Sequence, residues 1–300
     1  MEFCEVKNKI CQHIVKTIEK PDRYEFYKHI SMMLGDIATR PINISRKDVK
    51  SLAQVQKLAN QAKALLTSPP YVNYNQFGTK TGRLTTNKGS FPILTLNKAF
   101  RSSILPTNDY YVELDFNGAE VRTLLGLLEK PQPADDVHEF HMREVFTDLT
   151  SREDAKVAFF SWLYGANSSE MRAQAAKLAS FYEKDSLLDK YWDGNTVRTP
   201  FRKEIPDTSR HHALNYLVQS TAAELTLKQA LKVEHVLRNY SEGSTLAFLI
   251  HDAIVLDMKN EDEHLITTLV DLMSSTNFGK FKVNIKRGKT LGSMRAVQFG

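Results

Sequence analysis

Residues 110–122 read YYVELDFNGAEVR, and this stretch decides how the rest of the chain is interpreted. Apolar residues at alternate positions up to Phe116 predict a strand with one apolar face. An Asn-Gly pair then breaks the strand, and from Ala119 apolar residues recur at helical spacing. Asp115 is therefore expected at the carboxyl end of a strand, beside a turn. A carboxylate held there suits a metal ligand, and capping of the next helix is the alternative role.

The chain has 300 residues, which is enough for one large domain or for two to three subdomains. Its net charge of +5 and its pI of about 9.0 fit a nucleic-acid partner without identifying one. Cys4 and Cys11, with His13 nearby, do not form a zinc pattern, so two free thiols in a reducing compartment are expected. Neither a transmembrane run nor a signal-peptide core is evident, which favours a cytoplasmic protein with no membrane partner.

Helices are predicted over most of residues 1–68, with Ser45 as the N-cap of one of them. Further helices are expected across residues 136–183, from about 214 to 240 and near 261–275. Residues 186–209 are predicted to be a turn-rich connection, and residues 280–289 a basic strand.

The segment from Tyr71 to Tyr110 is polar and irregular, and it contains one acid, Asp109. Its basic residues are Lys80, Arg83, Lys88, Lys98 and Arg101. Such a segment can lie along phosphates, or it can be a solvated surface.

A second set of candidate residues repeats every four positions: Arg152, Lys156, Phe160 and Tyr164. This spacing places all four on one face of a helix, with Ser151 as its N-cap. Two cations followed by two aromatic rings can meet the phosphates, sugar and base of a nucleotide. The alternative is an amphipathic helix whose cations extend into solvent.

A third candidate site is the pair His251-Asp252, which interrupts the apolar run from Thr245 to Met258. The pattern predicts a tight hairpin with the polar pair at its tip. A charged residue in such a place needs a partner or a metal, although backbone amides alone can satisfy it. Together with Asp115, Asp252 could hold two divalent cations, which clamp the attacking and leaving oxygens of a phosphoryl transfer.

Four blocks of this chain resemble the polymerase region of family A DNA polymerases, of the bacterial repair and phage replicative type, and they occur in the family's order. TGRLTT at residues 81–86 resembles the TGRLSS block, and residues 115–122 resemble motif A, DYSQIELR. Residues 152–165 resemble motif B, and LIHDA at 249–253 resembles motif C, QVHDE. The helix before motif C is similar at Asn215, Gln219 and residues 221–223. The resemblance covers residues 71 to 292.

The resemblance implies a role for each matched position. Asp115, Asp252 and the Phe116 carbonyl would bind two Mg²⁺ ions. Arg152 and Lys156 would hold the incoming triphosphate, and Lys156 would also be able to donate a proton to the pyrophosphate leaving group. Phe160 would lie near the sugar and base, and Tyr164 by the template. Glu120 would be the steric gate against a 2′-hydroxyl. Contacts with the primer–template would come from Arg83, Asn215, Gln219 and His251.

The chain departs from the family at several positions. Ala253 replaces the glutamate of motif C and Leu249 its glutamine, while His211 stands where an arginine is usual. The glutamate is the less critical acid, so catalysis is expected to survive. The fingers segment is short, and no exonuclease domain is expected before the palm.

We therefore predict an α+β right-hand polymerase fold with an antiparallel palm sheet, helical fingers and a reduced thumb. The expected parts are a helical thumb-like segment (1–70), the palm (71–130 and 210–300) and the fingers (131–209). The expected activity is template-directed DNA polymerisation with deoxynucleoside triphosphates, and a second protein is expected to supply exonuclease or thumb contacts. The alternatives are a single-subunit phage-type RNA polymerase and a non-catalytic nucleic-acid-binding subunit with a polymerase fold.

Overall fold

The computed structural model describes residues 23–53, 59–146, 149, 151–165 and 172–297. Its central element is a five-stranded sheet in the order β13-β12-β5-β9-β8, in which every neighbouring pair is antiparallel. The strands are β5 (Tyr110–Phe116), β8 (Thr245–Ile250), β9 (Ala253–Met258), β12 (Val283–Gly288) and β13 (Arg295–Ala296). The predicted antiparallel sheet is therefore confirmed, and so is the hairpin with His251-Asp252 between its strands.

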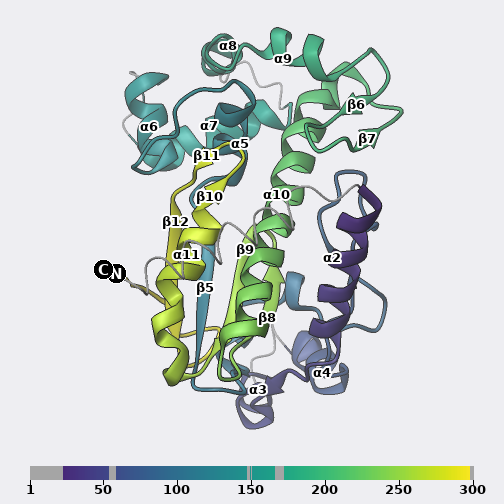
Figure 1. Cartoon of the computed structure of the whole chain (residues 1–300), viewed down its shortest axis with the longest axis vertical. Helices are drawn as coiled ribbons and strands as arrows, with labels where there is room; N and C mark the ends of the chain where they lie inside the picture. The colour runs from purple at the N-terminus through teal and green to yellow at the C-terminus, as the bar shows by residue number, and fades with distance from the viewer. Residues whose placement is uncertain (1–22, 54–58, 147–148, 150, 166–171, 298–300) are drawn as a thin grey trace.

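The helices of the described residues surround this sheet and continue beyond one end of it. They are α2 (Arg23–Ala38), α3 (Arg46–Ala53), α4 (Ala59–Thr67), α5 (Ala119–Leu127), α6 (Val137–Glu144), α7 (Arg152–Leu163), α8 (Arg172–Phe181), α9 (Lys184–Tyr191), α10 (Arg210–Tyr240) and α11 (Ile266–Ser274). Figure 1 shows α6 to α9 gathered at the end of the molecule where β5 passes into α5, and α3 and α4 at the opposite end.

Short two-stranded sheets and 3₁₀ turns complete the fold. The paired strands are β1 (Asn43–Ile44) with β4 (Ile104–Leu105), β2 (Tyr74–Asn75) with β3 (Thr85–Thr86), β6 (Val197–Arg198) with β7 (Glu204–Ile205), and β10 (Ser275–Thr276) with β11 (Gly279–Lys280). The 3₁₀ turns are η2 (Ile93–Thr95), η3 (Lys98–Ser103) and η5 (Asn260–Leu265).

Strand β5 begins and ends as predicted, but both of its faces are buried. Of its residues only Asp115 is not fully buried, whereas the alternation predicted one apolar and one exposed face. The second face is covered by neighbouring side chains, such as Phe248, whose ring lies 5.9 Å from that of Tyr111. On this face the Tyr111 hydroxyl donates to the Leu105 carbonyl at 2.7 Å. Glu113 lies directly opposite Lys286 of β12 and forms an ion pair with it.

Two hydrophobic cores lie along the molecule, and the long helix α10 contributes to both. The first core surrounds the sheet and includes α10 from Ala222 to Leu237, and the second includes α10 from Ala213 to Val218. A helix of 31 residues is about 45 Å long, which lets it cross both cores. Figure 1 shows α10 running from the end with α6 to α9 down beside β9 and β8.

The N-terminal helices belong to the core of the sheet, since Phe26, Ile30 and Ile37 of α2 are buried there. Ser45 caps α3 as predicted, because its Oγ accepts a hydrogen bond from the Asp48 amide at 3.4 Å. The assignment of residues 1–70 as thumb-like stays a prediction, as do the other boundaries between parts. Cys4, Cys11 and His13 lie outside the described residues.

The predicted connection at 186–209 is partly helical. Helix α9 continues to Tyr191, and the rest forms the β6–β7 hairpin. The prediction gave weight to Asp193-Gly194 and overlooked Leu187 and Leu188, whose burial in the second core favours the helix. Within the part of the chain that the structure describes, no helix combines the length and the apolar character needed to cross a membrane.

Candidate active site

The sheet brings two carboxylates together at one of its ends. Asp115 is the next-to-last residue of β5 and lies opposite Ala253, the first residue of β9. Asp252 immediately precedes Ala253 in the two-residue turn between β8 and β9. The first residue of this turn, His251, has a φ of 55°, a left-handed conformation that a tight hairpin requires. Antiparallel pairing therefore places Asp115 and Asp252 side by side, as predicted.

Burial and the charges of nearby acids disfavour the ionised forms of Asp115 and Asp252. Burial raises the pKa of Asp115 to about 6, and the charge of Glu113 adds to the shift, while Lys286 and a hydrogen bond with Asn284 oppose it. Burial also raises the pKa of Asp252; Arg83 opposes this shift and the charge of Asp115 adds to it. A cation bound between the two carboxylates would relieve this repulsion.

Arg83 is the cation that faces these acids from outside the sheet. Its guanidinium forms an ion pair with Glu120, which is 5% exposed in the first turn of α5. Burial acts to lower the pKa of Arg83, but the charges of Asp252 and Glu120 outweigh it and raise the pKa. The Tyr164 side chain lies close enough to Arg83 to contribute to this rise. Arg83 therefore links the end of α7 to the acidic end of the sheet.

Burial likewise raises the pKa of Glu120, and the charge of Asp252 adds to that shift, while Arg83 opposes it. The residue predicted to be a steric gate is thus held against Arg83 in this structure.

Helix α7 carries the predicted face of two cations and two aromatic rings. The Oγ of Ser151 caps the helix by accepting from the Asp154 amide at 3.4 Å, and Gly165 follows it with a φ of +75°. The rings of Phe160 and Tyr164 stack with centroids 5.9 Å apart and an angle of 14° between their planes. Lys156 on the same face is only partly buried and contacts Glu153 at 3.9 Å.

Arg152, the first residue of this face, forms an ion pair with the carboxylate of Asp136. Its Nε and Nη2 donate to the two oxygens of Asp136 at 3.0 and 2.7 Å. Asp136 also caps α6 and accepts from the Asn117 side chain at 2.8 Å. Burial acts to raise the pKa of Asp136, but the hydrogen bonds from Arg152 and Asn117 hold it well below its usual range. Asn117 directly follows β5, so Asp136 connects α7 to the end of that strand.

The four residues predicted to contact the primer–template lie in two places. Arg83 and His251 are neighbours. Burial lowers the pKa of His251, and the positive charge of Arg83 lowers it further. Gln219 and Asn215 lie one turn apart on α10, where the Gln219 side chain accepts from Thr81 at 2.9 Å. The Asn215 amide nitrogen is buried and donates to no described residue. The hairpin that holds Thr81 and Arg83 joins the two places.

Sequence reasoning missed Asp136 and His138, which adjoin the α7 face. Burial lowers the pKa of His138 to about 4, and the charges of Arg152 and Lys156 also lower it, although Asp136 opposes the shift. The His138 ring lies 6.2 Å from that of Phe160. The available signal was an aspartate immediately before the apolar repeat of α6, a common N-cap pattern. Its contact with Arg152 depends on packing that no local pattern reveals.

Comparisons with known proteins support the resemblance, although no protein-family model matches the chain. DNA polymerase I of Geobacillus stearothermophilus is 24% identical over 251 residues, which are 68% of this chain and 29% of that protein. DNA polymerase I of Lactococcus lactis subsp. cremoris (strain MG1363) is 24% identical over 247 residues, or 67% of this chain and 28% of that protein. The chain thus spans about three tenths of the length of these relatives.

A solved structure has the same fold. The POL domain of Pol1 from M. smegmatis, in complex with DNA primer-template and dNTP, superimposes with a TM-score of 0.66 and 16% sequence identity, over 98% of this chain and 65% of that one. The predicted right-hand polymerase fold is therefore confirmed, and so is the resemblance to the polymerase region of family A.

We expect Asp115→Asn to stabilise the protein at neutral pH. A carboxyl whose pKa is raised by folding weakens the folded state when it is ionised, so the penalty is full above about pH 6 and absent below the unfolded pKa near 4. The upper limit of the increase in the free energy of unfolding is about 3 kcal/mol. Urea unfolding without divalent cations at about pH 8 and about pH 4.5 should show a gain at the higher pH that shrinks at the lower. The control is Asp189→Asn, at an exposed position of α9. Equal stability of Asp115→Asn and wild type at both pH values would contradict the expectation.

Proposed function

We propose that this chain is a template-directed DNA polymerase that adds deoxynucleotides to the 3′ end of a primer. The observation that carries the proposal is the pair Asp115 and Asp252 at one end of the sheet, linked through Arg83 to the aromatic end of α7. Acids that bind cations and a helix face that suits a triphosphate are the two parts that phosphoryl transfer needs. The name of the solved structure with this fold records DNA primer-template and dNTP, which supports the same substrates here.

The residues present suit Mg²⁺ as the cation. Among the described residues, no group of three or more His, Cys, Asp and Glu side chains is arranged to hold a metal. Mg²⁺ does not need such a group, because it is commonly held by one or two carboxylates together with waters and substrate phosphates. Asp115, Asp252 and the Phe116 carbonyl would hold two ions. When bound, these ions would stabilise the attacking and leaving oxygens.

The chain's own residues would position the nucleotide and its leaving group. Lys156 extends from α7 with one weak contact, so it is available to a triphosphate and can give a proton to the departing pyrophosphate. Arg152 would exchange Asp136 for phosphate oxygens, which accept the same fork of donors. The stacked rings of Phe160 and Tyr164 offer a flat apolar surface beside which a sugar and base can lie.

The primer end would lie against the residues on the other side of Arg83. Gln219, Asn215 and His251 present polar groups there, and the buried Asn215 amide has a donor left for a ligand. Glu120, held by Arg83, would close the space that a 2′-hydroxyl needs. The reaction is attack of the primer 3′-hydroxyl on the α-phosphate with release of pyrophosphate, driven by positioning and electrostatics. A second protein with exonuclease or thumb contacts stays a prediction.

Asp115→Asn and Asp252→Asn should each abolish primer extension, because each carboxylate would hold a cation that stabilises the transition state. A loss of at least about 1000-fold is expected, with affinity for primer–template within about threefold of wild type. Extension assays with deoxy- or ribonucleotides and a fluorescence binding assay measure both, and Asp189→Asn is the matched control. Near-normal extension by either variant would refute the two-metal assignment, and a wild-type preference for ribonucleotides would establish the RNA polymerase alternative. No extension by wild type with either nucleotide would favour the non-catalytic subunit.

Glu120→Ala should raise the incorporation of ribonucleotides, because the smaller side chain leaves room for a 2′-hydroxyl. The substitution also removes the ion-pair partner of Arg83. The effect of the lost ion pair on sugar preference must therefore be separated from the effect of the smaller side chain. The measurement is the ratio of kcat/KM for ribo- and deoxynucleotides in Glu120→Ala, Glu120→Gln and Arg83→Ala. Glu120→Gln keeps the volume and loses the charge, so its ratio should stay close to that of wild type. An unchanged ratio in Glu120→Ala shows that the gate assignment is wrong.

Asp136→Asn should lower the KM for deoxynucleotides by roughly three- to tenfold, because an amide competes less strongly than a carboxylate for Arg152. The substitution keeps an oxygen that can cap α6. Steady-state kinetics of the single variants and of Asp136→Asn with Arg152→Ala form a double-mutant cycle. The gain should disappear when Arg152 is absent. A higher KM in Asp136→Asn would mean instead that Asp136 holds Arg152 where the nucleotide needs it.

A further inference from the structure

Strand β8 ends at the His251-Asp252 turn, yet it lies at the edge of the sheet. Only one side of an edge strand is paired, so its outward amides and carbonyls need other partners to stay ordered. The position of Asp252 depends on this strand, because the turn is only two residues long. Whatever fixes the free edge of β8 therefore also fixes one of the two carboxylates.

The Tyr74 hydroxyl provides this contact at the end of β8 nearest the turn. It donates to the Leu249 carbonyl at 2.8 Å and accepts from the Leu249 amide at 3.0 Å. One hydroxyl thus satisfies both outward groups of a residue that lies two positions before His251. Tyr74 is 7% exposed and Leu249 is 1% exposed, so water does not readily replace either bond.

Tyr74 also starts the hairpin that carries Arg83. It pairs with Thr86 in the β2–β3 ladder, and the loop between these strands holds Arg83 against Glu120 and Asp252. The hairpin, α10 and β8 enclose a cavity of about 20 Å³, which both Arg83 and Leu249 line. Through Tyr74, the cation and the carboxylate of the site share one point of attachment.

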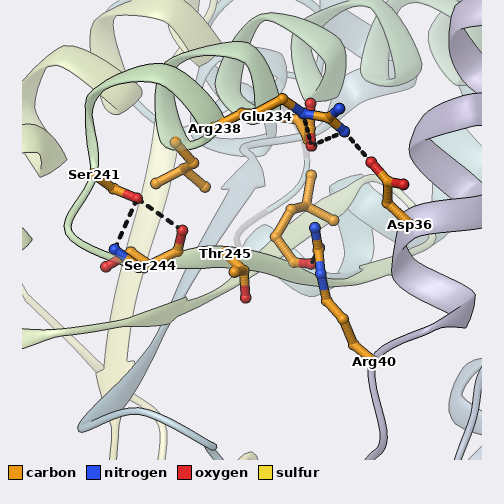
Figure 2. Close-up of a pocket in the computed structure, with 10 residues that line it drawn as sticks. Asp36, Arg40, Glu234, Arg238, Ser241, Ser244 and Thr245 are labelled. Atoms are coloured by element: carbon orange, nitrogen blue, oxygen red, sulfur yellow. Dashed lines mark hydrogen bonds and ion pairs between the residues drawn. The ribbon is translucent and has the colours of Figure 1, made fainter.

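The other end of β8 has a different kind of contact. Arg40 donates to the Leu246 carbonyl beside a cavity of about 350 Å³. Figure 2 shows Arg40 reaching β8 near Thr245, with Arg238 between Asp36 and Glu234 on the opposite wall. Because this cavity is open and polar, water can replace the Arg40 contact. The Tyr74 contact near the turn is buried, whereas the Arg40 contact is only partly buried.

We propose that Tyr74 is a positioning residue for the catalytic carboxylate Asp252, acting through the two hydrogen bonds with Leu249. The inference rests on the proposed function, in which Asp252 binds Mg²⁺. Removing the hydroxyl leaves the outward amide and carbonyl of Leu249 without these two bonds and lets the turn move relative to Arg83. Displacement of a catalytic group by about 1 Å can lower a rate by roughly 100-fold. Loss of the hydroxyl should therefore reduce kcat more than nucleotide binding.

The first test follows the hydrogen bond directly, with no need for activity. In Tyr74→Phe the Leu249 amide should exchange with deuterium on the order of tenfold faster than in wild type. Amides of β9, which pair within the sheet, should keep their protection and so report that the variant is folded. Tyr71→Phe is the matched control, because Tyr71 lies three residues away and is 41% exposed. Unchanged exchange at Leu249 in Tyr74→Phe would overturn the proposal.

The second test follows the consequence for the site. In primer extension, Tyr74→Phe should lower kcat by roughly tenfold or more, raise the Mg²⁺ concentration that gives half-maximal rate, and change the nucleotide KM by less than about twofold. Tyr71→Phe should behave as wild type. Faster exchange at Leu249 with unchanged kcat and Mg²⁺ dependence would overturn the positioning role. If wild type itself does not extend a primer, the proposed function fails, and the exchange result still decides whether the bond orders β8.

A third variant separates positioning from a loss of folding. 4-Aminophenylalanine at position 74 keeps a group that can both donate a hydrogen bond to Leu249 and accept one from it. It should restore Leu249 protection and kcat together, to within about threefold of wild type. If Tyr74→Phe is unfolded, this variant carries the decision. Restored folding without restored kcat would overturn the proposal.

Discussion

The candidate site depends on the register between β5 and β9. Side chains along a strand alternate between faces, so a slip of one residue would move Asp115 to the opposite face of the sheet. The pairing of Asp115 with Ala253 fixes that register, and the pairing of Asn284 with Asp115 repeats it on the other side. Burial of both faces of β5 opposes a one-residue slip, because it would bring Glu113 and Asp115 to the face that Val112, Leu114 and Phe116 now occupy. The fold thus holds two like charges at one end of the sheet.

Holding them there has an electrostatic cost that the surrounding residues only partly offset. Lys286 faces Glu113 and also acts on Asp115, and Arg83 faces Glu120 and Asp252, so each of these two cations is shared between acids. Burial and repulsion still raise the pKa of Asp115 and of Asp252. Local instability of this kind is expected where a protein binds cations, because the ligand completes the charge balance. The same groups that repel one another in the absence of a cation would strengthen the proposed metal site.

The parts of this site that could be predicted are those specified by local sequence. Alternation and an Asn-Gly break located β5 and its end at Phe116, and a polar pair in an apolar run located the β8–β9 hairpin. The four-residue spacing from Arg152 to Tyr164 located the face of α7. Each of these signals lies within about a dozen residues, where backbone geometry alone decides which side chains meet.

What could not be predicted comes from contacts between distant segments. The bonds from Tyr74 to Leu249 and from Arg152 to Asp136 join residues whose local patterns indicate nothing more than a strand and a helix start. The burial of both faces of β5 was missed for the same reason, since it depends on contacts with distant segments, such as those of Tyr111 with Leu105 and Phe248. Residues 186–191 were assigned to a connection because turn residues follow them, while the core that holds Leu187 and Leu188 lies elsewhere in the sequence.

The contacts of α7 suggest how binding and movement would be coupled under the proposed function. At one end Arg152 is hydrogen-bonded to Asp136, and at the other Tyr164 lies close to Arg83. Both are residues that would contact a nucleotide or template. A ligand that binds Arg152 and Tyr164 must displace these contacts, so its binding energy acts on the position of α7. Since Asp136 leads to Asn117 and Arg83 leads to Asp252, any shift of α7 is transmitted to the two strand ends that hold the carboxylates. Under the proposed function, nucleotide binding and the geometry of the acidic site are therefore linked through these contacts, in addition to the second hydrophobic core that α7 shares with α5.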